Sequence, residues 1–402
     1  MIDTSGRAPL RSVSRRWERA TADRDPPFAI VDLDAVDANL DDLLARADGV
    51  PIRLATKSLR CRALVERAVA RPGVAGLMCY ALREALWHAG LGTSDDVLVG
   101  YPTVDRAALR DLAADEHARR TVTLMVDSVG HLDLIDDVLG AGHPGIRVCL
   151  DLDAAWRPLP RLHIGARRSP VRTPAQAAAL ARAIVGRPGV RLVGLMAYEG
   201  QIAGVPDATG ARLRDAAVRW MQRRSADELA GRRGAVVRAV REVADLDFVN
   251  GGGSGSVETT RADPSVTEIA AGSAVVGATL FDGYTRMHPR PALAYALPVT
   301  RRPDGGHATL AGGGWVASGP ATASRLPTPF GPGDLALTAT EGAGEVQTPV
   351  RGRRLPALGD RVWMRHAKAG ELAEHVTEYL GIRGDEVVLA MPTYRGEGKA
   401  FG

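Results

Sequence analysis

The stretch PIRLATKSLRC, residues 51–61, runs through apolar residues up to Lys57 and then becomes polar, with helical periodicity. Its apolar part, residues 52–57, has the length of a strand that is buried on both faces. Similar apolar runs recur along the chain, at residues 28–34, 74–80, 96–102, 121–127, 146–153, 191–200 and 247–253. Segments with helical periodicity separate these runs. The alternation predicts parallel strands that are joined by helical crossovers.

Eight such units over about 250 residues predict an α/β fold, built on a (β/α)8 barrel of the TIM type. An open, doubly wound sheet has similar spacing and remains the alternative. The first run, residues 28–34, is also compatible with a place outside the barrel. In that case residues 273–281, SAVVGATLF, are the candidate closing strand.

The sequence changes character after residue 289. Short strand-like runs such as DLALTAT, EVQTPV and DRVWMRHA alternate with Gly, Pro and Asp turns, which predicts a C-terminal antiparallel β domain. We therefore predict a leader over residues 1–27, a barrel over residues 28–288 and a β domain over residues 289–402. The Arg-rich leader is predicted to be helical or to wrap over another subunit.

Composition excludes several classes of protein. The 402 residues are 45% hydrophobic and 24% charged, with a formal net charge of +4. No basic run is interleaved with aromatic residues, so we expect no nucleic-acid binding. No run approaches the roughly 18 apolar residues of a membrane span, so we expect no membrane association. Cys61, Cys79 and Cys149 are far apart in sequence, which favours free thiols in a cytoplasmic protein.

Lys57 ends the second apolar run. In a (β/α)8 barrel, catalytic side chains gather at the C-terminal ends of the strands. A lysine there can form a Schiff base with pyridoxal phosphate when burial or a nearby cation lowers its pKa. Arg53 and Arg60 flank Lys57 in sequence and are the candidate cations. The alternative is a strand-end lysine that extends into solvent.

A glycine-rich motif, VNGGGSGSVET at residues 249–259, follows the last apolar run. Its backbone N–H groups are not obstructed by side chains, and the hydroxyls of Ser254 and Ser256 add hydrogen-bond donors. Barrels often bind phosphate with the loops that follow the seventh and eighth strands. The motif does not fit the G-x-G-x-x-G pattern of dinucleotide sites, so a phosphate site is favoured. A flexible turn is the alternative.

Four features follow one another in a familiar order: Lys57, the run GLMAYEGQ at residues 194–201, the glycine-rich motif, and VTEIAAGSAVVGATLFDGY at residues 266–284. Together they resemble the fold-type III pyridoxal-phosphate enzymes of the D-threonine aldolase and D-serine dehydratase group. That group is itself similar to alanine racemase. The resemblance covers residues 28–284 well and implies an alanine-racemase-like barrel, a following β domain and a homodimer.

The resemblance also implies roles for particular residues. Lys57 matches the Schiff-base lysine, Tyr198 matches a tyrosine close to the cofactor ring, and Arg167 falls where the family has an arginine near the ring nitrogen or O3′. The residues that match the phosphate site are Gly252, Gly253, Ser254, Gly255 and, near the phosphate, Tyr284. A core aromatic is the alternative for Tyr198, and a solvated loop arginine is the alternative for Arg167.

One departure from the family concerns a metal. Members of the group bind a divalent ion near the C-terminus through a His-x-Cys or His-x-Asp pair, whereas Tyr394 and Gly396 occupy those positions here. Gln201 replaces a histidine of the family's Tyr-x-Gly-His run. We therefore expect no divalent metal. A site rebuilt from other residues is the alternative, and its candidate ligands are His366, Glu371, His375 and Glu397.

These observations predict a pyridoxal-phosphate-dependent lyase that acts on a small D- or β-hydroxy amino acid. Cα–Cβ aldol cleavage ranks first, eliminative deamination second and racemisation third. Without a metal, a side chain has to act as the acid–base group, and His366 and Tyr394 are the candidates. Two alternatives from other classes remain: a non-catalytic pyridoxal-phosphate-binding protein, and a barrel enzyme that binds a sugar or nucleotide phosphate.

Overall fold

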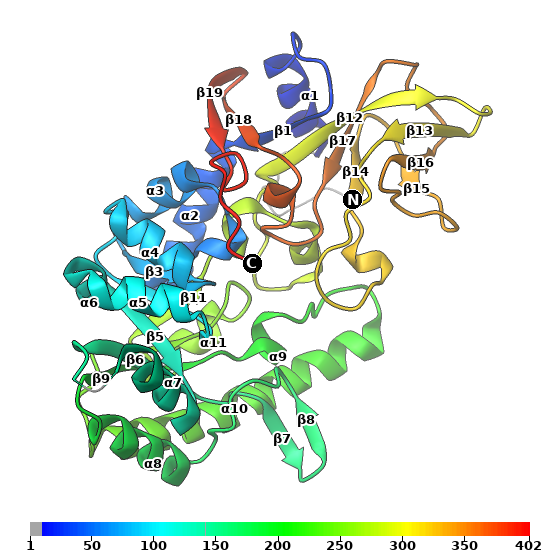
Figure 1. Ribbon diagram of the computed structural model, residues 1–402. Coiled ribbons are helices and arrows are strands. Elements are labelled where there is room, and N and C mark those ends of the chain that lie inside the picture. The colour runs from blue at the N-terminus through cyan, green and yellow to red at the C-terminus, as the bar shows by residue number, and fades with distance from the viewer. Residues whose placement is uncertain (1–9, 141) are drawn as a thin grey trace. The chain divides into compact units, whose positions relative to one another are not determined.

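Eight parallel strands close into a barrel, and the strand that precedes Lys57 is one of them (Figure 1). Around the barrel the strands follow the order β10, β11, β2, β3, β4, β5, β6, β9. Their bounds are β2 (Ile52–Ala55), β3 (Val74–Cys79), β4 (Val97–Val99), β5 (Val122–Val126), β6 (Ile146–Asp151), β9 (Val190–Ala197), β10 (Phe248–Gly251) and β11 (Glu268–Ala271). The predicted (β/α)8 barrel is confirmed.

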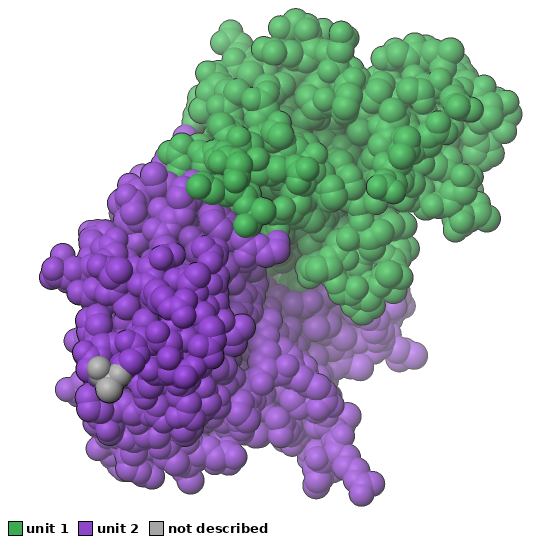
Figure 2. All heavy atoms as spheres, in the orientation of Figure 1, with its two compact units in different colours: residues 1–42, 58–64, 273–400 green, residues 43–57, 65–272, 401–402 purple. Residues whose placement is uncertain are grey.

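The computed structural model describes residues 10–140 and 142–402. Contacts within the chain define two compact units, which Figure 2 colours separately. Unit 1 comprises residues 58–64, 273–400 and the described part of 1–42, and unit 2 comprises residues 43–57, 65–272 and 401–402. The whole barrel belongs to unit 2. Within the described residues, no helix is both long and apolar enough to cross a bilayer.

Helices follow most of the barrel strands. Their bounds are α2 (Leu33–Ala47), α3 (Arg62–Val69), α4 (Leu82–Gly90), α5 (Arg106–Ala114), α6 (Glu116–Thr121), α7 (Val129–Leu139), α8 (Pro174–Val185), α9 (Gly200–Ala203), α10 (Arg212–Arg241) and α11 (Val257–Arg261). Local sequence explains where they begin. At α8, for example, Thr173 and Gln176 form a reciprocal capping box and Pro174 occupies the first turn.

The last barrel strand differs from the prediction. Residues 273–281 form no strand; they lie in the 3₁₀ turns η2 (Ser273–Val276) and η3 (Thr279–Gly283), and β11 closes the barrel instead. Gly277 shows why the chain cannot continue as a strand there. Its φ is +63°, and a Cβ at this position would lie 2.0 Å from the carbonyl oxygen of Arg290. Only glycine permits this close approach.

Unit 1 is built on a nine-stranded sheet in which β1 (Phe28–Asp32) lies between β12 and β18. Its other strands are β12 (Leu293–Arg301), β13 (His307–Ala311), β14 (Thr328–Gly331), β15 (Ala336–Leu337), β16 (Gln347–Arg351), β17 (Arg361–Arg365), β18 (Glu378–Arg383) and β19 (Glu386–Pro392). Apart from the parallel pair β1–β18, the strands pair antiparallel. The first apolar run therefore lies outside the barrel, as its alternative placement predicted.

The described part of the leader forms the helix α1 (Leu10–Ala20). Its residue Trp17 is fully buried in a cluster that includes Ile30 and Trp363, and its indole Nε1 donates a hydrogen bond to Asp32 at 2.9 Å. Burial of a tryptophan with its N–H satisfied anchors a helix firmly. The described leader is thus helical and packs on the sheet of its own chain. Residues 1–9 lie outside the described part.

Arg53, one of the two candidate cations near Lys57, is paired with other residues. Its side chain is fully buried, and it donates to Glu268 at 2.6 Å and to Asp96 at 2.6 Å. The charge of Arg53 is therefore neutralised by two carboxylates. Arg60 is likewise ion-paired with Glu374 within unit 1.

Cys61, Cys79 and Cys149 are all buried free thiols.

Candidate active site

Polar side chains gather where the barrel strands end. Lys57 lies in the 3₁₀ turn after β2, Tyr101 after β4, Asp151 at the end of β6, and Tyr198 directly after β9. The glycine-rich motif follows β10. Parallel strands of a barrel bring their C-terminal ends to one rim, which is where barrel enzymes place their active sites. All of these residues belong to unit 2.

Lys57 is paired with a tyrosine that the sequence analysis did not single out. Its side chain is exposed, and Nζ donates a hydrogen bond to the Tyr101 hydroxyl at 2.7 Å. Burial would raise the pKa of Tyr101, but the positive charges of Lys57 and Arg168 outweigh it and lower that pKa. The strand-end position of Lys57 was predicted correctly, whereas nothing in the sequence relates residue 101 to residue 57.

An arginine lies between two aromatic rings at the same rim. The guanidinium carbon of Arg168 is 5.3 Å from the ring centroid of Tyr101 and 5.1 Å from that of Tyr198. Burial raises the pKa of the Tyr198 hydroxyl, although the charge of Arg168 opposes this effect. The arginine predicted for this position was Arg167; both Arg167 and Arg168 are exposed, and the guanidinium that contacts the two rings is that of Arg168.

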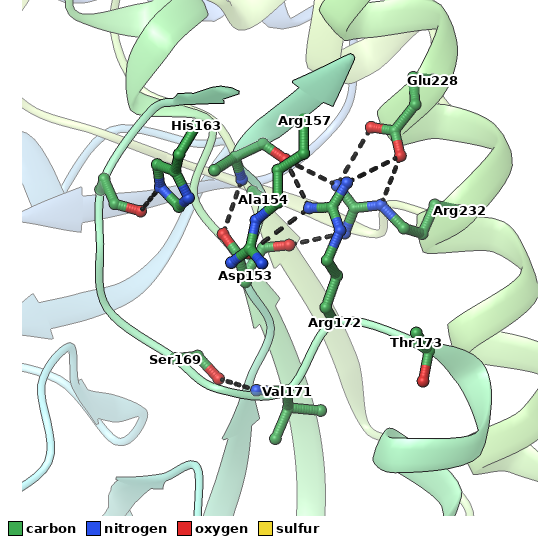
Figure 3. Close-up of polar contacts among 12 residues, drawn as sticks. Asp153, Ala154, Arg157, His163, Ser169, Val171, Arg172, Thr173, Glu228 and Arg232 are labelled. Atoms are coloured by element: carbon green, nitrogen blue, oxygen red, sulfur yellow. Dashed lines mark hydrogen bonds and ion pairs between the residues drawn. The ribbon is translucent and has the colours of Figure 1, made fainter. Parts of the chain in front are cut away.

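An ion-pair network around Asp153, drawn in Figure 3, holds the two ends of the segment that contains Arg168. Asp153 accepts from Arg157 at 2.5 Å and from Arg172 at 3.4 Å. Arg232 of α10 donates to the carbonyl oxygen of Asp153 at 2.6 Å. These contacts fix both ends of residues 154–172, which include the hairpin of β7 (Trp156–Leu159) and β8 (Leu162–Ile164). We infer that the network positions Arg168.

The backbone of the glycine-rich motif packs closely against neighbouring residues, which glycine permits because it has no Cβ. Gly252 has a φ of +85°, and a Cβ there would lie 2.9 Å from Ile269 Cγ2. A Cβ at Gly253 would lie 2.9 Å from the Cβ of Ala203. Ser254 Oγ accepts the amide N–H of Gly272 at 3.3 Å. The turn is therefore shaped by backbone, with its hydroxyl groups held in place.

A buried glutamate accepts hydrogen bonds from this turn and from the helix that follows it. Glu199 Oε2 accepts the N–H of Gly252 at 3.1 Å, and Oε1 accepts the hydroxyl of Ser256 at 3.2 Å and that of Thr260. Arg233 of α10 lies 3.8 Å from Glu199 and so offsets part of its charge. Glu199 lies within the run GLMAYEGQ, where residue type alone indicates no role for it. A buried charge is costly unless it is paired and hydrogen-bonded, and this one is both.

Asp151 is a titrating carboxyl at the rim. It is 6% exposed, and burial raises its pKa to about 7, with Asp127 and Asp153 acting in the same direction and Arg168 against it. Carboxyl groups with pKa values near neutrality cluster at functional sites. An aspartate that ends an apolar strand was visible in the sequence, but its burial was not.

The remaining predicted site residues belong to unit 1. Tyr284 is buried against Phe281, with ring centroids 5.4 Å apart. His366 is fully buried, and burial lowers its pKa to about 3, with the charge of Arg365 acting in the same direction and a backbone hydrogen bond with Leu293 opposing it. Tyr394 is buried, and its backbone N–H donates to the carbonyl oxygen of Arg60 at 2.8 Å. The roles of these three residues remain predictions.

Two of the four residues considered for a rebuilt metal site, Glu397 and His375, have other partners. Glu397 pairs with Arg62 at 2.7 Å, and the ring of His375 stacks on Trp315 with centroids 4.5 Å apart. Over residues 10–140 and 142–402, no three His, Cys, Asp or Glu side chains form a group that could hold a metal. Gly396 fits tightly, because a Cβ there would lie 1.8 Å from the carbonyl oxygen of Thr377.

Comparison with known proteins follows this geometry. The family described as alanine racemase, N-terminal domain, matches residues 31–279. A D-threonine aldolase from Arthrobacter sp. is 27% identical over 252 residues, which are 62% of this chain and 60% of that protein. The match therefore spans about three fifths of the relative's length.

Solved structures share the fold. A D-threonine aldolase from Filomicrobium marinum is 23% identical, with a TM-score of 0.77 over 93% of this chain and 96% of that chain. The D-threo-3-hydroxyaspartate dehydratase from Delftia sp. HT23 is 20% identical, with a TM-score of 0.69 over 92% and 97%. An alanine racemase from E. faecalis is 17% identical, with a TM-score of 0.60 over 85% and 88%.

Proposed function

Because the chain belongs to the alanine racemase N-terminal domain family, we propose that it is a pyridoxal-phosphate-dependent lyase of small amino acids. The similarity to D-threonine aldolases in sequence and fold supports Cα–Cβ cleavage of a D-configured β-hydroxy amino acid as the reaction. The observation that carries the proposal is the occurrence, on one barrel rim, of an exposed amine at Lys57 and a backbone-lined turn at Gly252–Gly255.

The residues present fit the cofactor. Glycine lets the backbone of the turn at residues 252–255 approach a bound phosphate closely. The N–H groups of Gly252 and Gly253 already donate to Glu199 and Ser256, so their part would be to hold the shape of the turn. Lys57 would bind the aldehyde, and Tyr198 and Arg168 would contact the rest of the cofactor. When bound, pyridoxal phosphate supplies an electron sink for the bond that breaks at Cα.

The chain itself has to move protons. At neutral pH the imidazole of His366 is a weak proton acceptor, because burial lowers its pKa to about 3. Asp151 lies at the rim with a pKa of about 7, so we assign it the acid–base role at the substrate. Tyr394 remains the sequence-based alternative. We further propose, from the family resemblance, a cytoplasmic homodimer in which Tyr284 contributes to the phosphate site.

Eliminative deamination is the second candidate reaction, and the structural similarity to a D-threo-3-hydroxyaspartate dehydratase supports it. Cleavage of Cα–Cβ would release glycine and an aldehyde from D-threonine. Elimination would instead release a 2-oxo acid and ammonia from D-serine or D-threo-3-hydroxyaspartate. Product analysis with these three substrates distinguishes the two reactions.

The decisive experiment is to reduce the cofactor-loaded protein with borohydride and map the labelled peptide. The proposal requires the label on Lys57. A protein that gains no visible absorption after incubation with pyridoxal phosphate, or a label on another lysine, contradicts it. Racemisation, the third candidate, is tested by following the α-proton of D-alanine in deuterated water.

A further inference from the structure

The contact between Lys57 and Tyr101 is more than a surface hydrogen bond. Lys57 Nζ lies 2.7 Å from the Tyr101 hydroxyl and 5.4 Å from the centroid of its ring, so the ammonium is at the hydroxyl edge. The side chain of Tyr101 is partly buried, which orders the oxygen that faces Lys57. The distance is within the range in which a proton passes directly between two heavy atoms.

The charges around Tyr101 favour its phenolate. The groups that face it are Lys57, after β2; Arg168, from the segment after β6; and Tyr198, after β9. Two of these three carry a positive charge. The pKa of Tyr101 is accordingly lowered, although burial alone would raise it. Tyr198 contacts the same guanidinium, but its pKa is raised by burial.

We propose that Tyr101 is a catalytic residue whose phenolate oxygen accepts a proton from Lys57 Nζ as that nitrogen bonds to an aldehyde carbon. The inference rests on the proposed function for the identity of the aldehyde. An amine that adds to a carbonyl must lose a proton from nitrogen. In this step the Nζ–H bond breaks and the Tyr101 O–H bond forms, while the electron pair left on nitrogen forms the bond to the aldehyde carbon and the π pair of the C=O bond moves to the carbonyl oxygen. Tyr101 passes its proton to that oxygen, and a second proton transferred from Nζ by the same route lets the oxygen leave as water, with one hydrogen left on nitrogen. When Lys57 is released again, Tyr101 transfers protons back to Nζ.

One property makes the assignment specific to Tyr101. Its oxygen contacts the reacting nitrogen directly at 2.7 Å, and Tyr198 contacts Arg168. The variants Tyr101→Phe and Tyr198→Phe remove the same atom from two neighbouring rings. They therefore form a matched pair, in which only the first should change proton transfer at Lys57.

The first measurement uses the full chain after removal of cofactor with hydroxylamine, and follows phenolate formation by ultraviolet difference titration. One of the seven tyrosines should ionise below the usual pKa of about 10. That component should be absent in Tyr101→Phe and retained in Tyr198→Phe. If Tyr101→Phe keeps it, or if the wild type lacks it, the proposal is wrong whatever the cofactor is.

The second measurement follows the rate at which pyridoxal phosphate combines with Lys57, by stopped-flow absorbance at several pH values. General base catalysis contributes about 10²–10⁴ in rate, so we expect Tyr101→Phe to slow this step by at least tenfold. The affinity of Tyr101→Phe for inorganic phosphate should equal that of the wild type. This measurement serves as the control for correct folding of the variant. An unchanged rate in Tyr101→Phe overturns the role of Tyr101. Failure of the wild type to combine with the cofactor overturns the proposed function instead.

Discussion

Glu199 accepts the backbone N–H of Gly252 at 3.1 Å, so one buried carboxylate joins the residues after β9 to the turn after β10. Tyr198 precedes Glu199 in the chain, and the glycine-rich turn is the proposed phosphate site. Any movement of the carboxylate therefore affects both sides of the proposed cofactor site. This relationship leads to the first prediction.

Glu199→Gln should weaken the binding of pyridoxal phosphate by at least tenfold. The amide cannot neutralise Arg233, and its NH2 group offers a donor where Ser256 and Thr260 also donate. Loss of such contacts costs about 1–3 kcal/mol, and about 1.4 kcal/mol corresponds to a factor of ten. Equilibrium titration of the cofactor-free protein measures the effect.

Glu258→Gln is the control for this experiment. Glu258 is half-buried and pairs with Arg46 at 2.7 Å, close to the same turn but without a bond to Gly252. We expect Glu258→Gln to lose less affinity for pyridoxal phosphate than Glu199→Gln does. Equal losses in the two variants would show that Glu199 has no special part in shaping the turn.

Gly252→Ala should lower both stability and cofactor affinity, whereas Gly210→Ala should lower stability alone. Both glycines have positive φ, +85° and +89°, and alanine in that region costs roughly 1–2 kcal/mol. At Gly210 a Cβ would meet nothing within 4 Å, but at Gly252 it would crowd Ile269 and Thr260. Thermal unfolding and cofactor titration of both variants separate backbone strain from loss of the proposed phosphate site. A normal affinity in Gly252→Ala would argue against a phosphate at this turn.

Arg168→Ala should lower kcat/KM about tenfold, and Arg167→Ala should leave it within about twofold. Arg168 contacts the rings of Tyr101 and Tyr198, and each cation–π contact contributes about 0.5–1 kcal/mol at an exposed site. Arg167 is its exposed neighbour. Steady-state kinetics of the two variants with D-threonine makes the comparison. The reverse ranking would restore the assignment that the sequence alone suggested.

Asp151→Asn should change how stability depends on pH. The pKa of Asp151 is raised from 3.8 to about 7, so the folded protein binds its proton more tightly than the unfolded chain does. This group therefore makes the free energy of unfolding fall as pH rises from about 4 to about 7, by on the order of 4 kcal/mol at most. The difference in the free energy of unfolding between Asp151→Asn and the wild type should therefore favour the variant more at pH 8 than at pH 4.

Asp153→Asn provides the contrast. Asp153 is buried and binds Arg157 and Arg172, so its loss should destabilise the protein at both pH values. Denaturant unfolding at pH 4 and pH 8 gives both comparisons. If the difference between Asp151→Asn and wild type is independent of pH, then Asp151 does not titrate in this range.

Activity should survive treatment with a metal chelator. The second ligand position of the family is Gly396 here, and a side chain there would collide with the carbonyl oxygen of Thr377 at 1.8 Å. For the same reason Gly396→Asp should gain no affinity for Mn²⁺. Activity measured with chelator, and titration calorimetry of the variant, test this expectation. Loss of activity in chelator, restored by added metal, would show that the site has been rebuilt elsewhere.

Local sequence determined the barrel strands and the position of Lys57. Buried parallel strands need continuous apolar runs of a definite length, so β2, β6 and β9 could be located from residue types alone. The glycine turn was visible for a similar reason, since a backbone that has to approach another group closely requires glycine. By contrast, short segments such as β11 and residues 273–281 contain similar residues and differ only in their tertiary contacts.

The tertiary structure alone decided which side chains meet at the rim. Tyr101 and Lys57 are 44 positions apart in the chain, and no sequence period relates them. The choice of Arg168 over Arg167 depends on which of two adjacent side chains points toward the rings. Glu199 and Asp151 acquire their roles from burial, because removal from water strengthens each hydrogen bond to a carboxylate and raises the cost of its charge. Sequence thus determined which strands carry functional groups, and packing decided which of those groups act on one another.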